Sequence, residues 1–69
     1  MPYFQANELL ENPEASLEEL LKALFDLGKQ WGYIASATSY GLRENAEPEL
    51  IRIIVLSDMI IHRIQRQQQ

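Results

Sequence analysis

Asp58 and His62 are the residues whose types and spacing come nearest to a chemical site, since an aspartate is followed one helical turn later by the single histidine of the chain. Side chains four residues apart on a helix lie next to each other on its surface. The pair could act as an acid and base near neutral pH. The alternatives are a hydrogen bond on the helix surface and a histidine that packs against a partner chain. The sequence favours these simpler interpretations.

Other catalytic or metal-binding patterns are missing from the sequence. One histidine with scattered carboxylates does not supply matched ligands for zinc or calcium. The chain has no cysteine, no glycine-rich phosphate loop, and no serine in a recognisable order with histidine and a carboxylate. We therefore expect no cofactor and no metal, and the sequence favours a binding protein over an enzyme.

A group of aromatic and small residues could form a binding surface. Two glycines, Gly28 and Gly32, lie near the aromatic residues Trp31, Tyr33 and Tyr40. Each glycine lowers helix stability by about 1 kcal/mol relative to alanine. The aromatic side chains either frame a ligand pocket or protein interface, or fill the gap that the glycines leave, and the second is the commoner arrangement. The glycine spacing favours close helix packing in a bundle.

A first long helix is predicted over residues 16–41. Ser16 and Glu19 form a capping box at its start, and Gly41 suits the left-handed position at its end. Apolar and small residues at alternating steps of four and three form a seam, which we expect to face the core. The seam comprises Leu17, Leu21, Leu24, Gly28, Trp31, Ala35, Thr38 and Leu42, and Leu20, Leu27 and Ile34 widen it on one side.

A second helix is predicted over residues 48–66, with Pro48 in its first turn. One of its faces should pack on the seam, and Leu56 lies apart from it. That face comprises Leu50, Ile53, Ile54, Ser57, Ile60, Ile61 and Ile64. A second apolar ridge, Ile51, Val55 and Met59, follows at every fourth residue on another side. A two-helix hairpin covers one face of each helix, so this ridge needs another chain or another protein.

Size and charge narrow the function further. A chain of 69 residues without disulfides is near the limit of independent stability, which favours oligomerisation. The net charge of -4 argues against nucleic-acid binding, and the apolar run near residues 49–64 is too short and too interrupted by charges to span a membrane. Without a signal segment, a cytoplasmic protein is expected. Residues 1–15 are predicted as an arm that folds onto the core, and 67–69 as a frayed tail.

Part of the second helix resembles a known family. The run Pro48 to Ile53, followed by Asp58, Ile60 and Ile61, is similar to the second helix of the small sporulation-control phosphatases. These are helical hairpins that dephosphorylate an aspartyl phosphate on a response regulator. The chain departs from their pattern at Ile54 and Ser57, where the family has serine and leucine. The resemblance implies that Asp58 would face the phosphorylated partner.

Taken together, these patterns predict an all-α protein: an antiparallel two-helix hairpin with a short N-terminal arm that dimerises into a four-helix bundle. The predicted function is protein-protein interaction, as a regulator or adaptor acting as a homodimer or tetramer and binding another protein. The alternatives are action on a phosphorylated response regulator through Asp58, and a subunit of an obligate hetero-complex. We expect Leu21 to matter for folding and Val55 for association. The candidate interface residues are Ile51, Val55, Met59, His62, Trp31, Gly28 and Gly32.

Overall fold

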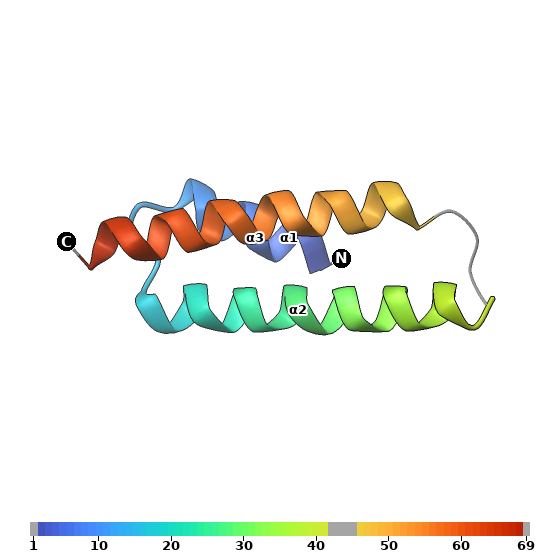
Figure 1. The fold of residues 1–69 in the computed structure, drawn as a ribbon. Helices are drawn as coiled ribbons and strands as arrows, with labels where there is room; N and C mark the ends of the chain where they lie inside the picture. Colours follow the sequence, from blue (N-terminus) through green and yellow to red (C-terminus); the bar gives the residue numbers. More distant parts are fainter. Residues whose placement is uncertain (1, 42–45, 69) are drawn as a thin grey trace.

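The computed structural model describes residues 2–41 and 46–68, and these residues form three helices without a strand. They are α1 (Pro2–Glu11), α2 (Leu17–Ser39) and α3 (Glu47–Gln67). The two long helices run side by side in opposite directions, and α1 lies against both (Figure 1). The all-α prediction is confirmed. Where the sequence predicted two helices and an arm, most of the arm is a helix of ten residues.

Local sequence signals explain where α2 begins and ends. The hydroxyl of Ser16 accepts a hydrogen bond from the backbone N–H of Glu19 at 3.1 Å, and Glu19 Oε1 accepts one from the backbone N–H of Ser16 at 3.1 Å. The predicted capping box is therefore present. At the other end Gly41 has a φ of +73°, a left-handed conformation that glycine adopts without steric cost.

The ends of α1 and α3 also follow from residue type. Pro48 lies in the first turn of α3, as predicted, where its missing N–H removes no helical hydrogen bond. After α1, the side chain of Asn12 accepts a hydrogen bond from the backbone N–H of Glu14 at 2.9 Å. This local turn and the following Pro13 stop the helix and reverse the chain toward α2.

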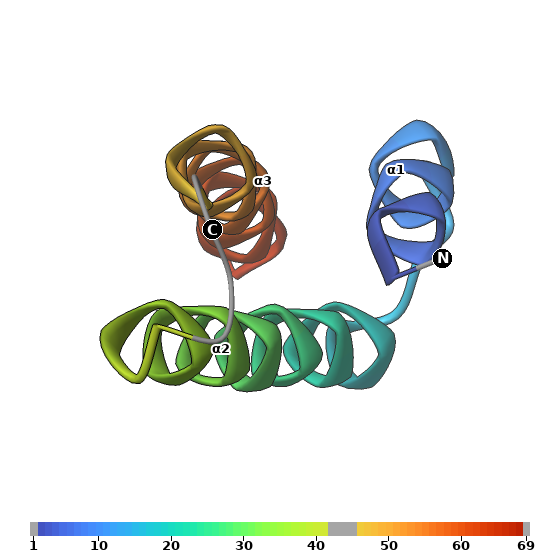
Figure 2. The same cartoon turned by 90° about the vertical axis from the view of Figure 1, so that its right-hand side faces the viewer.

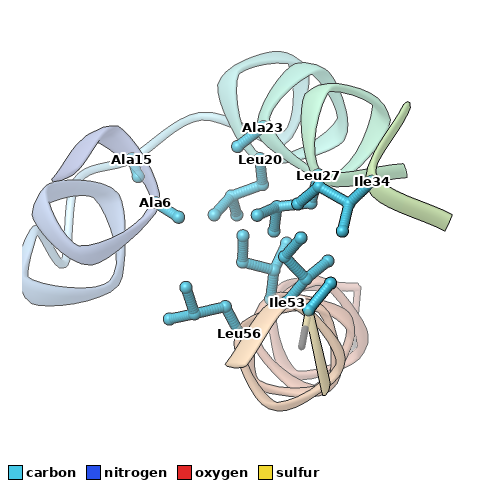
Figure 3. Packing of buried hydrophobic residues seen from close by; sticks show 10 residues of the cluster. Ala6, Ala15, Leu20, Ala23, Leu27, Ile34, Ile53 and Leu56 are labelled. Atoms are coloured by element: carbon cyan, nitrogen blue, oxygen red, sulfur yellow. The ribbon is translucent and has the colours of Figure 1, made fainter. Parts of the chain in front are cut away.

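The core lies between the three helices and consists of aliphatic residues and alanines (Figure 3). Its largest fully buried side chains are Leu20 and Leu27 of α2 and Ile53 and Ile60 of α3. The buried members of the core are Ala6, Ala15, Leu20, Ala23, Leu27, Ile34, Ala46, Ile53, Leu56 and Ile60. Four of these are alanines, whose small side chains allow neighbouring backbones to approach closely.

The buried stripe of α2 differs from the predicted seam. Leu20 is fully buried, whereas Leu21 is 49% exposed and Leu17 is exposed as well. On α3, Leu56 is buried although it was expected to lie apart, and Ile54 is 53% exposed although it was expected to pack. Because α2 must face α1 as well as α3, its buried stripe is rotated by roughly a quarter turn toward the α1 side. Leu42, the last position of the predicted seam, lies outside the described residues.

The short helix α1 covers one side of the α2–α3 pair. Figure 2 shows α1 and α3 next to each other over α2, with no helix of the described chain on the opposite side of the pair. Among the described side chains of α1, Ala6 is buried, and Leu9 and Leu10 are partly buried against the core. Tyr3 and Phe4 also belong to the predicted arm, and their side chains lie outside the described part. The pair thus has one covered side and one open side.

Candidate functional site

Asp58 and His62 meet on the surface of α3, as their spacing predicts. His62 Nδ1 lies 3.4 Å from Asp58 Oδ2, and both side chains are about two-thirds exposed. Exposed pairs of this kind contribute little to stability. The geometry is that of a solvated helix-surface pair, with the Asp58 carboxylate accessible to a partner molecule.

The ridge Ile51, Val55 and Met59 lies on the outside of α3. Each of the three side chains is about half exposed. The ridge borders a shallow groove of about 460 Å³ between α1 and α3, to which Asn7 of α1 and Pro48 contribute. The predicted surplus of apolar surface on α3 is therefore present in the monomer.

A second apolar surface lies on the open side of the α2–α3 pair. We call it the open face, and it comprises Leu17, Leu21, Gly28 and Trp31 of α2 together with Ile54 and Ile61 of α3. Its five large side chains are between 38% and 53% exposed. A hollow of about 330 Å³ lies within it, lined by Gly28, Trp31, Ile54, Ile61 and Asp58, among others. Sequence reasoning had assigned most of these residues to the interior.

The glycines and aromatic residues of α2 do not fill a gap in the core. A Cβ atom placed on Gly28 or on Gly32 would meet no atom within 4 Å, so both positions face open space. Trp31 is partly covered at 38% exposure, whereas Tyr33 and Tyr40 are largely exposed. The two glycines therefore have no packing role inside the chain.

Arg63 is a buried residue that sequence reasoning missed. Only 9% of it is exposed, and its Nη1 donates a hydrogen bond to the carbonyl of Leu10 at 3.3 Å. Its Nη2 donates to the carbonyl of Asn12. Gln67 Nε2 adds a hydrogen bond to the carbonyl of Ala15 at 2.9 Å. These cationic and amide donors satisfy carbonyls at and after the C-terminal end of α1 and fasten it to α3.

The carboxylates in the described part of the chain do not make a metal site. A polar groove between α1 and α2 is lined by Glu8, Glu11, Glu19 and Asp26 with Lys22, yet no group of three or more potential ligands has a geometry that could hold a metal ion. Hydrogen bonds from the Ser16 backbone N–H, and then from its hydroxyl, lower the pKa of Glu19 from 4.5 and outweigh the opposite effect of desolvation. This shift belongs to helix capping.

Among the described residues, no helix combines the length and the hydropathy that a membrane span requires. Comparisons with protein-family models, with curated proteins and with solved structures gave no match for this chain. The features of the described surface that bear on function are two apolar rows and one exposed acid-histidine pair.

Proposed function

We propose that the protein is a small non-catalytic helical interaction protein, a regulator or adaptor that acts as a homo-oligomer. The observation that carries this proposal is the exposure of large apolar side chains in ordered rows on two sides of the α2–α3 pair. Monomeric proteins rarely expose contiguous apolar patches of more than a few hundred Å² unless the patch binds something. Two such rows are best explained by two contacts, one with a second copy and one with another protein.

Five of the seven candidate interface residues belong to these two rows, and His62 and Gly32 belong to neither. Ile51, Val55 and Met59 form one row, and Trp31 and Gly28 belong to the other. The assembly we propose is a four-helix bundle made from two antiparallel α2–α3 hairpins. A subunit of an obligate hetero-complex would present similar rows, and in that case the chain alone would not associate with itself.

The experiment that tests homo-oligomerisation is the solution mass by light scattering on a size-exclusion column, repeated across a dilution series. We expect a mass of twice the 8.0 kDa chain that falls toward a single chain on dilution. A mass of one chain at every concentration, with full helical circular dichroism, would contradict the proposal. Such a result would favour the hetero-complex.

A second candidate function is action on a phosphorylated response regulator. It is supported by the accessible carboxylate of Asp58 on the surface of α3, next to the imidazole of His62. The test compares the wild type with Asp58→Asn for release of phosphate from an aspartyl-phosphorylated receiver domain. Turnover that is lost in the variant would favour this function, and equal rates at the level of spontaneous hydrolysis would exclude it.

A further inference from the structure

The open face is a strip of uncharged side chains along one long side of the molecule. On α2, its residues are spaced by four, seven and three positions: Leu17, Leu21, Gly28 and Trp31. On the neighbouring side of α3, it contains Ile54 and Ile61, which are seven positions apart. Helices with this spacing pack side by side with a facing helix, each apolar side chain entering a space between residues of the other. The partner for which α2 is patterned is therefore another helix.

We infer that the open face binds the open face of a second copy, with a two-fold axis parallel to the helices. This inference rests on the proposed homo-oligomeric function. It assigns the surface through which the two chains bind and the orientation of one chain relative to the other. In such a dimer α2 of one chain lies on α3 of the other, and neighbouring helices across the interface run in opposite directions. The four long helices form the bundle, and α1 of each chain lies on its outside.

The dimensions of the molecule suit this occupant. Its principal extents are 43 × 18 × 16 Å, so one long side of 43 × 18 Å has a projected area of roughly 770 Å². A standard stable interface buries about 800 Å² on each partner. The open face lies on that long side, and its residues extend from Leu17 in the first turn of α2 to Trp31, which is about half the length of the side. A second copy supplies a surface of equal length and equal apolar character.

The charges at the borders of the face complement each other under this symmetry. We place Lys29 on the outer border of α2, because it lies about 100° around the helix from Gly28, on the side of the exposed Phe25, whose ring centroid is 5.5 Å from its Nζ. Asp58 lies on the outer border of α3, where it lines the same hollow as Gly28. A two-fold axis parallel to the helices keeps each residue at its level and exchanges the two borders. It therefore brings Lys29 of each chain to the level of Asp58 of the other. The dimer then has two equivalent ion pairs, each between a positive and a negative side chain.

The first test compares two similarly exposed apolar residues in the full chain. We expect Leu21→Glu in the open face to weaken dimerisation at least ~100-fold, because it buries an unpaired charge, while Val55→Glu on the ridge changes the dissociation constant less than ~3-fold. Helical circular dichroism checks that both variants fold. If Leu21→Glu does not fold, Ile61→Glu replaces it on the other helix of the same face.

The outcomes separate this inference from the proposed function. A dimer that persists in Leu21→Glu and dissociates in Val55→Glu would overturn the assignment of the open face and leave homo-oligomerisation intact. A folded wild-type chain that stays monomeric would overturn both. Trp31, the single tryptophan, offers a direct readout, since its fluorescence emission should shift to shorter wavelength when the face is covered.

The second test addresses the orientation by reversing charges. Lys29→Glu alone and Asp58→Lys alone should each weaken the dimer about 3- to 10-fold, since two symmetry-related pairs change at once. The double variant should return to within about 3-fold of the wild type, because the ion pairs re-form with exchanged signs. Losses that simply add in the double variant would rule out this two-fold arrangement and point to α2 packing on α2.

Discussion

The two sides of the α2–α3 pair both carry apolar side chains, and they differ in what covers them. On the covered side, α1 closes over Ala23 and Leu56 and is fastened by a buried arginine. On the open side, leucine, isoleucine and tryptophan side chains remain about half exposed. The difference teaches that a regular apolar pattern marks a surface suited to helix packing, whether or not the same chain covers that surface.

The largest contrast should come from two adjacent leucines. Leu20→Ala should lower the free energy of unfolding by about 3 kcal/mol, because its side chain is fully buried and its removal leaves a cavity. Leu21→Ala should cost less than ~1 kcal/mol when measured at concentrations where the chain is monomeric, since that side chain is already half exposed. Urea unfolding followed by circular dichroism measures both values, and equal losses would show that the two sides do not differ.

A somewhat smaller effect is expected where α1 is fastened. Arg63→Ala removes charged donors from two carbonyls and should cost about 2 kcal/mol. Hydrogen exchange should show the largest loss of protection in α1. Arg66→Ala, one turn further and exposed, serves as the control and should change stability by less than ~0.5 kcal/mol. Unchanged protection of α1 in Arg63→Ala would mean that apolar contacts alone hold it.

On the open side, filling an empty position should stabilise the monomer. Gly28→Ala should raise the free energy of unfolding by about 1 kcal/mol, because alanine is the better helix former and its methyl group meets no atom of the same chain. The matched control is Gly41→Ala, which should lower stability by about 1 kcal/mol because the φ of +73° is unfavourable for any residue with a Cβ. Thermal unfolding of dilute samples compares the two, and the same sign for both would contradict this explanation.

The smallest predicted effect is a pH dependence at the start of α2. Because folding lowers the pKa of Glu19, its capping contribution is complete above the unfolded value of 4.5 and is lost as the pH falls through the lower, folded pKa. Glu19→Gln should remove this part of the acid sensitivity. Comparing unfolding curves of the two proteins from pH 6 to pH 3 measures it, and parallel pH profiles would show that the capping carboxylate does not contribute.

Much of the fold could be predicted from local chemistry. The capping box at Ser16, the left-handed Gly41 and the early Pro48 each depend on a few neighbouring residues, and all three are present in the structure. The exposed ridge of α3 was also predicted, because its residues lie on a different side of the helix from those of the packing face. Such features need no knowledge of distant parts of the chain.

The orientation of α2 could not be predicted in the same way. It depends on α1, in which the small Ala6 is buried, and alanine adds little to a pattern of hydrophobic periodicity. Arg63 was missed because a charged side chain is normally placed outside. Its position three residues after Ile60 and seven after Leu56, on the buried stripe of α3, was the signal that could have identified it.

The fastening of α1 also has a consequence for the order of folding. The hydrogen bonds from Arg63 and Gln67 join residues that are 51 to 53 positions apart, so they cannot form before α3 is in place. Contacts with large sequence separation form late, because closing the loop costs entropy before any contact is gained. During synthesis, the contacts of α1 with α2 can therefore form first, because they join neighbouring parts of the chain, whereas the hydrogen bonds that fasten α1 to α3 form only after α3 has been made.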